Sequence, residues 1–404
     1  MVKLERSLGL FQVTVMGVGI ILGAGIYALI GVAASNAGNA TWLSFFISAV
    51  IAIFTGLSYA ELSSMFKGDS AEYHYLATAF NKKFAFVIGA SILAAGFVSS
   101  AAVALGFGGY FGQLVGMPIV WGAILLIVLM TVINFIGIKE SSWFNTVSTS
   151  IEFLGLLVII VLGITKFGSV NYFEMPAGLT GVFSSAALVF FAYLGFEGIV
   201  KLREETINPE KTIPKALVYS ILITSVVYVL VAISAVSIVG WEALAASDAP
   251  LATAAAAVLG SPAFIVLAII ALFSTANTVL IMLVTNSRMI YGMAKEMKSL
   301  PKILSKVHKK TRTPYVAILV FMLLCIAFTL IGDLELVANL TNLFVFITFA
   351  SVNLALIVLR YKEPKMKRPF KCPLNVGKFS IIALVGFLTS LFMLGIIIRN
   401  LIIV

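Results

Sequence analysis

Hydrophobic residues in this chain form long runs that short polar stretches separate. A helix needs about 20 apolar residues to cross a bilayer, and these runs have that length. The alternation over about ten residues that marks the strands of a membrane β-barrel is missing. We therefore predict an all-α integral membrane protein with eleven transmembrane helices, at residues 11–35, 42–65, 84–114, 118–138, 147–166, 180–200, 214–239, 262–290, 314–331, 336–360 and 379–399.

No linker rich in Ser, Gly or Pro divides the chain, so we expect residues 1–404 to form one membrane domain. The polar residues 1–9 precede a run of full span length without a clear cleavage site, which argues against a cleaved signal peptide. Residues 70–80 read SAEYHYLATAF and predict a short amphipathic helix along the membrane face.

The composition narrows the class of protein. The 404 residues are 61% hydrophobic and 11% charged, whereas soluble domains are about 45–50% apolar and about 25% charged. This excludes a cytosolic enzyme, a secreted disulfide scaffold and a disordered regulator. The two cysteines and two histidines have no metal-ligand spacing, and there is no ATP-binding motif, so we predict no metal site and no cofactor.

The net charge of +10 is explained by topology. If the N-terminus is cytoplasmic and the spans alternate, every Lys and Arg except Lys166 and Arg399 lies on the inner side. We therefore expect a multi-pass protein of the cell membrane, with its C-terminus outside after eleven spans. A nucleic-acid partner is not needed to explain the charge.

Two spans contain corresponding weak points. Span 1 is interrupted at Gly23-Ala24-Gly25 and span 6 at Tyr193-Leu194-Gly195, about 170 residues further on. An odd number of spans separates them, so the two halves run in opposite directions. We expect inverted repeats at residues 11–166 and 180–360 and one additional helix at 379–404.

The interruptions suggest what binds there. Glycines at 17, 19, 23 and 25 make a break in span 1 plausible, because each costs a helix about 1 kcal/mol relative to alanine. A break frees N–H groups that suit a carboxylate, although close helix packing also explains the glycines. In span 6 the freed carbonyls suit an ammonium. Together the breaks predict a zwitterion, an α-amino acid.

Four segments resemble the amino acid–polyamine–organocation (APC) transporter family. They are MGVGIILGAGIY (16–27), FFAYLGFE with EETINPEKTIPKAL (190–197 and 204–217), SRMIYGMAKEMKSLPK (287–302) and LRYKEPKMKRPFKCPL (359–374). The resemblance covers nearly the whole chain. It implies a LeuT-like fold of five plus five inverted spans, usually followed by two more, of which this chain has one.

The resemblance also implies a substrate site. It comprises Ile21, Gly23, Ala24, Gly25, Ile26, Phe191, Leu194 and Gly195. The N–H groups that follow Gly23 would bind the carboxylate, and the carbonyls of Ile21, Phe191 and Leu194 the ammonium. Phe191 matches an aromatic gate, and Glu197 matches an acidic residue that couples binding to gating.

Two carboxylates, Glu152 and Glu197, lie within predicted spans, where buried acids are functional candidates. Glu152 occupies a position where some APC members carry a lysine tied to proton coupling, so we predict a proton site there. The alternative is a hydrogen-bonded structural carboxylate. Further polar residues of spans 3 and 8 are candidates for the pocket or for a sodium site, or pack the helices: Ser99, Ser100, Ser274, Thr275 and Asn277.

These observations predict a secondary active transporter for neutral or broadly selected amino acids, driven by protons through alternating access. Obligate exchange and transport of cationic amino acids or polyamines are alternatives. An intramembrane enzyme and a nutrient sensor are remote ones. At the inner end of span 6, Lys201 and Arg203 could form a cytoplasmic gate by pairing with Glu61 or with the neighbouring Glu204 and Glu205. They could also reach the interface alone.

Overall fold

The computed structural model describes residues 8–66, 71–136, 138–296 and 300–403. Lys3, Arg6 and Lys67 of the predicted inner-face set lie outside this part of the chain. Within it, nine helical stretches are long and apolar enough to cross a membrane by length and composition. The all-α membrane fold is therefore confirmed, and the number of eleven spans stays a prediction.

Each predicted span coincides with one helix or with a broken pair. The first half contains α1 (Leu10–Ile21), α2 (Ala24–Ala37), η1 (Gly38–Ala40), α3 (Thr41–Met65), α4 (Ala71–Ala79), α5 (Lys82–Val115), α6 (Ile119–Ile136) and α7 (Ile138–Ile164). The second half contains α8 (Gly178–Val189), η2 (Phe190–Tyr193), η3 (Phe196–Glu205), α9 (Pro209–Ala245), α10 (Pro250–Leu259), α11 (Ser261–Glu296), η4 (Lys302–Ser305), α12 (Tyr315–Thr329) and α13 (Leu334–Lys362). The hairpin of β1 (Asn375–Val376) and β2 (Phe379–Ser380) then leads into α14 (Ile381–Ile403).

Some boundaries differ from the prediction. α4 confirms the short helix expected within residues 70–80. α7 begins at Ile138 rather than at residue 147, because its first turns are polar and hydropathy does not detect them. The apolar run of α10 is too short for a span, and that helix was not predicted.

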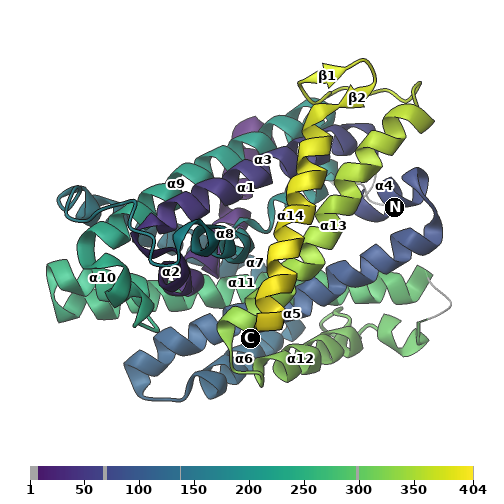
Figure 1. Cartoon of the computed structure of the whole chain (residues 1–404). Coiled ribbons are helices and arrows are strands. Elements are labelled where there is room, and N and C mark those ends of the chain that lie inside the picture. The colour runs from purple at the N-terminus through teal and green to yellow at the C-terminus, as the bar shows by residue number, and fades with distance from the viewer. Residues whose placement is uncertain (1–7, 67–70, 137, 297–299, 404) are drawn as a thin grey trace.

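The long helices pack side by side into one bundle (Figure 1). α3 lies along α9, α13 runs between α14 and α5, and α11 contacts both α5 and α7. Small residues allow this close approach. A Cβ at Gly56 of α3 would come within 2.4 Å of the Ile221 side chain on α9. Such contacts are typical of helices that associate in lipid.

Spans 1 and 6 are both broken. Between α1 and α2, Leu22 and Gly23 are extended, so the break precedes Ala24 and Gly25, which form the first turn of α2. Between η2 and η3, Leu194 is extended and Gly195 has φ +112°. A side chain at Gly195 would be strained, and its Cβ would also lie 2.8 Å from the Ile20 carbonyl oxygen.

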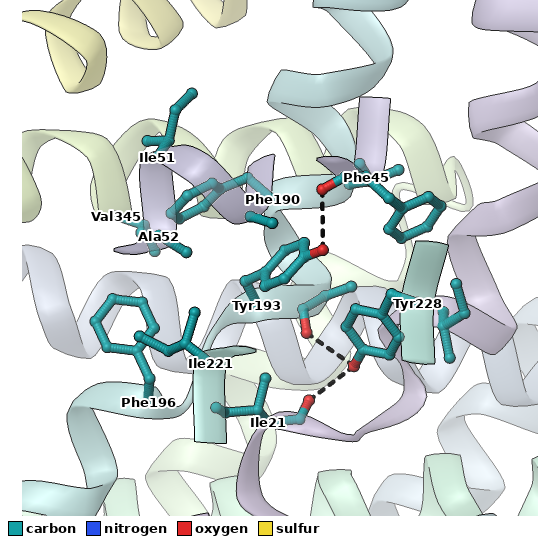
Figure 2. Close-up of a cluster of buried hydrophobic side chains, with 14 of the residues drawn as sticks. Ile21, Phe45, Ile51, Ala52, Phe190, Tyr193, Phe196, Ile221, Tyr228 and Val345 are labelled. Atoms are coloured by element: carbon teal, nitrogen blue, oxygen red, sulfur yellow. Dashed lines mark hydrogen bonds between the residues drawn. The ribbon is translucent and has the colours of Figure 1, made fainter. Parts of the chain in front are cut away.

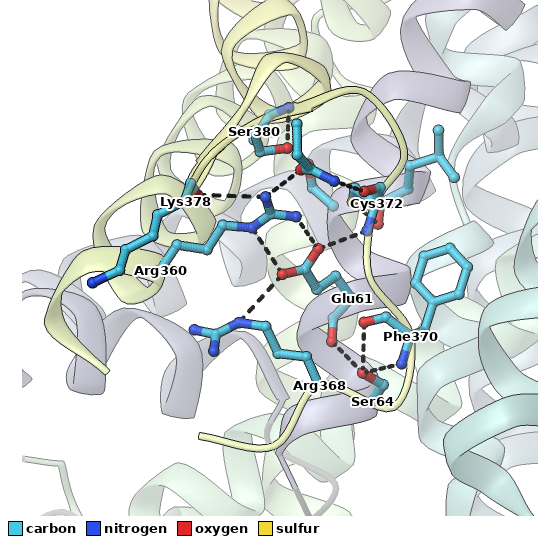
Figure 3. Close-up of polar contacts among 12 residues, drawn as sticks. Glu61, Ser64, Arg360, Arg368, Phe370, Cys372, Lys378 and Ser380 are labelled. Atoms are coloured by element: carbon cyan, nitrogen blue, oxygen red, sulfur yellow. Dashed lines mark hydrogen bonds and ion pairs between the residues drawn. The ribbon is translucent and has the colours of Figure 1, made fainter. Parts of the chain in front are cut away.

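The end of the bundle that carries the hairpin is fastened by a buried ion cluster (Figure 3). Arg360 of α13 donates from Nε to Glu61 Oε1 of α3 at 2.9 Å and from Nη2 to Oε2. Arg368 Nε lies 3.4 Å from Glu61 Oε1, and the Cys372 N–H donates to Oε2 at 2.7 Å. Glu61 therefore pairs with Arg360 and Arg368. The side chains of Lys201 and Arg203, its predicted partners, lie outside the described residues.

Candidate substrate site at two broken helices

The two breaks lie against each other. A Cβ at Gly25 would come within 2.5 Å of the Ala192 Cα, and one at Gly195 would meet the Ile20 carbonyl. Backbone of α2 thus packs on η2, and backbone of η3 packs on the end of α1. Ile21, Ala24, Gly25 and Ile26 are all buried, as is Phe191.

Tyr228 of α9 connects the breaks (Figure 2). Its hydroxyl lies 2.9 Å from the Ile21 carbonyl oxygen, at the end of α1, and 3.0 Å from that of Ala192 in η2. The side chain is fully buried. In the same view Tyr193 donates to the Phe45 carbonyl at 2.9 Å, which joins η2 to α3.

The first turn of α2 presents donors. The Ala24 N–H donates to Thr278 Oγ1 of α11 at 3.2 Å. In the described part of the chain, no acceptor is seen for the N–H groups of Gly25 and Ile26. The start of a helix also carries a partial positive charge, so this turn suits a carboxylate.

The span 6 break presents acceptors and a capping acid. The Phe191 carbonyl accepts from the Leu194 N–H at 3.3 Å, and Glu197 Oε2 accepts from the Gly195 N–H at 2.9 Å. The Phe191 side chain is 5% exposed and packs in a cluster with Ala24. Glu197 thus caps the turn that follows the break.

Glu152 of α7 faces α11 at the level of the first break. One turn away on either side, Asn277 Nδ2 approaches Thr149 Oγ1 at 3.4 Å and Gly155 contacts Ile270. Glu152 is 1% exposed, and neither of its carboxyl oxygens has a hydrogen-bond partner among the described residues. Its main-chain carbonyl accepts from the hydroxyl of Tyr27, a residue of α2, at 2.9 Å.

The remaining polar candidates are all buried, and they divide into two groups. Ser99, Ser100 and Thr275 donate to carbonyls of their own helices, as packing residues commonly do. Ser274 Oγ makes no hydrogen bond of normal length among the described residues, but its hydroxyl on α11 approaches the Glu152 carboxyl of α7.

Sequence reasoning missed Tyr228, Thr278 and Tyr27. Thr278 lies one helical turn after Ser274, so the same periodic face could have indicated it. Tyr228 and Tyr27 gave no local signal, since a tyrosine in an apolar run is common and their partners are far away in sequence.

A multi-helix membrane bundle whose two broken helices meet at buried backbone groups is typical of membrane transporters. The amino acid permease family model matches residues 8–401. The branched-chain amino acid permease BcaP of Bacillus subtilis is 31% identical over 92% of this chain and 84% of its own length. The methylthioribose transporter of B. subtilis is 29% identical (92% and 85%). The vacuolar cationic amino acid transporter 4 of Arabidopsis thaliana is 28% identical (90% and 64%).

The chain therefore belongs to the amino acid permeases of the APC superfamily. It is a multi-pass amino acid transporter and not an enzyme.

Proposed function

We propose that this protein carries an α-amino acid together with a proton across the cell membrane by alternating access. The proposal that a proton is co-transported rests on Glu152. Its carboxyl group is buried without a hydrogen-bond partner among the described residues, beside the first break. A charged carboxylate without a counter-ion is costly in such a place, so a proton is the simplest partner for it.

Substrate recognition follows from the backbone of the breaks. The N–H groups of Gly25 and Ile26 receive the carboxylate, and the carbonyls near Ile21 and Leu194 receive the ammonium. Phe191 covers the substrate from the outside as a gate, and Glu197 couples substrate binding to movement of that gate. The close contact of Gly25 with Ala192 leaves little polar side-chain chemistry at the breaks, which favours neutral amino acids.

The coupling follows from the position of Glu152. Its main chain is bonded to Tyr27 of α2, and its helix face contacts α11. Protonation removes the cost of burying the charge and so favours the conformation in which α2, α7 and α11 are packed together. Release of the proton on the other side restores that cost and favours the opposite conformation.

The half-helices of spans 1 and 6, one from each of the repeats at residues 11–166 and 180–360, then rock against spans 3, 4, 8 and 9, with the N-terminus in the cytoplasm. The basic residues on one side of the predicted spans support this orientation.

The test is uptake of labelled amino acids into empty proteoliposomes, with and without an inward proton gradient. The proposal predicts accumulation above equilibrium with the gradient, and loss of its pH dependence in Glu152→Gln. Glu335→Gln is the matched control, because Glu335 bonds Asn36 at the outer end of α2, away from the breaks, and should stay pH-dependent. Uptake that requires preloaded amino acid would indicate exchange, and uptake that requires sodium would indicate a different ion.

A substitution at Gly25 does not test binding alone, because any side chain would collide with Ala192. Substrate analogues that lack the carboxylate test binding without changing the protein. Replacing the carboxylate by an amide should raise KM about tenfold or more, as expected when hydrogen bonds to a charged group are lost. An amine that is transported as well as the amino acid would instead support the alternative of cationic or polyamine substrates.

A further inference from the structure

The hydroxyl of Tyr228 faces more acceptors than it can serve. A phenol carries one proton, yet the Ile21 and Ala192 carbonyl oxygens lie 2.9 and 3.0 Å from the same hydroxyl oxygen. All three oxygens are buried inside the bundle. One carbonyl is therefore without this proton at any moment, and a buried acceptor without a donor costs free energy.

Two other buried tyrosines of this region each have one carbonyl acceptor for their one hydroxyl proton. Tyr193 donates to the single carbonyl of Phe45, and Tyr110 donates to that of Tyr27 at 3.1 Å. These hydroxyls fasten one helix to one other. Tyr228 is different because its two acceptors belong to the two broken spans, α1 and η2.

From this geometry we infer that Tyr228 is a positioning residue of the substrate site: it holds the Ile21 and Ala192 carbonyls together so that a substrate ammonium supplies the missing proton. When the ammonium donates to Ile21, the tyrosine proton serves Ala192, and all acceptors are satisfied. The site then selects an amino group with enough N–H donors for all the free carbonyls. This inference rests on the proposed amino acid transport.

The arrangement also explains why the recognition is selective. A hydroxy acid or a tertiary amine fits the same space but brings fewer donors. The ammonium has three N–H groups for the three proposed acceptors, the carbonyls of Ile21, Phe191 and Leu194, so a ligand with fewer donors leaves at least one of them unpaired. An unpaired buried acceptor is the kind of defect that gives strong discrimination between similar substrates. A methyl group on the nitrogen removes one donor, and a methyl group on the α-carbon adds similar bulk without removing one.

The experiment compares transport KM for an amino acid, its N-methyl analogue and its α-methyl analogue, in the wild type, Tyr228→Phe and Tyr193→Phe. We expect N-methylation to raise KM about tenfold more than α-methylation does in the wild type, the effect of one hydrogen bond to a charged group. In Tyr228→Phe this excess should fall to about twofold or less, because the Ile21 and Ala192 carbonyls lose the hydroxyl that positions them. Tyr193→Phe loses an equally buried hydroxyl and should keep the full excess.

Several results would overturn the inference. One is a wild type that tolerates both methyl groups equally. Another is a Tyr228→Phe variant that transports all substrates more slowly while keeping the tenfold excess, because a merely structural tyrosine would behave in that way. If the wild type transports no amino acid at all, the proposed function itself fails, which is a different result.

A second measurement avoids the risk that Tyr228→Phe misfolds. 3-Fluorotyrosine at position 228 keeps the hydroxyl and reports its hydrogen bond through the ¹⁹F resonance. Saturating amino acid should shift this resonance, and the matching carboxylic acid that lacks the α-amino group should not. The same label at Tyr110, whose hydroxyl donates to the Tyr27 carbonyl, should not respond to either ligand. An unchanged resonance at position 228 under saturating amino acid would refute the inference.

Discussion

The Glu61 cluster provides the sharpest test of the packing, through the substitution Arg360→Met. Methionine keeps much of the volume of the arginine stem and removes its charge. Glu61 is fully buried and Arg360 is 3% exposed, so water cannot replace the lost guanidinium. The variant leaves a buried carboxylate with Arg368 at 3.4 Å and the Cys372 N–H at 2.7 Å.

The magnitude follows from these contacts. Breaking a buried ion pair by removing one partner costs about 3–5 kcal/mol. The remaining contacts to Arg368 and Cys372 place this variant near the lower end, at about 3 kcal/mol. Since 1.4 kcal/mol is a factor of ten, the ratio of folded to unfolded protein should fall roughly a hundredfold.

The assay is unfolding in mixed micelles, followed by tryptophan fluorescence. Lys362→Met is the matched control on the same helix. Lys362 is exposed and donates to the Thr78 and Ala79 carbonyls at 3.0 and 3.4 Å, so its loss should cost about 1 kcal/mol or less.

The double variant Glu61→Met/Arg360→Met should recover most of the loss, because a buried pair can often be replaced by apolar residues at little cost. The reasoning is refuted if Arg360→Met unfolds within about 1 kcal/mol of the wild type, or if the double variant is less stable than the single one.

Three further outcomes are expected. Gly195→Ala should lower the free energy of unfolding by about 2 kcal/mol, since φ is +112° and the new Cβ meets the Ile20 carbonyl; no loss in a thermal melt would contradict this. Thr278→Val should cost about 1–3 kcal/mol by leaving the Ala24 N–H without its acceptor, whereas Thr285→Val, exposed on the same helix, should cost less than about 0.5 kcal/mol. Burial, reinforced by the Glu61 carboxylate, raises the pKa of the Cys372 thiol well above its usual value. Only the unfolded chain then ionises above about pH 8.5, and the stability that this thiol contributes is lost as the pH rises further. Cys372→Ser should make the alkaline fall in Tm shallower, and an unchanged slope would argue against the assignment.

The sequence predicted best those features that depend on residues close together in the chain. Long apolar runs predicted the membrane helices, and clustered glycines predicted the break in span 1 to within two residues. Glu152 was selected because a carboxylate in an apolar run is rare, and the structure places it beside that break. Its role in transport remains a prediction.

Other features depend on partners that local patterns do not reveal. Glu61 and Arg360 are about 300 residues apart, and an arginine at a helix end also fits simple snorkelling to the interface. Tyr228 is about 200 residues from Ile21, in a run where most side chains only need to be apolar. Tertiary geometry decides which of many similar residues meet, and periodicity carries no information about it.

The continuity of α2, η1 and α3 has a mechanical consequence. From Ala24, at the proposed substrate site, the chain follows α2, turns at Gly38 (φ +65°) into η1, and continues along α3 to Met65, beyond Glu61. Through Glu61 it is bonded to α13 and to the segment that carries the β1–β2 hairpin. A displacement of the first turn of α2 is therefore linked to the hairpin end of the bundle by the short turn at Gly38 and the length of α3. A fluorophore on the exposed Gly377 turn of the hairpin would read that displacement without touching the substrate site.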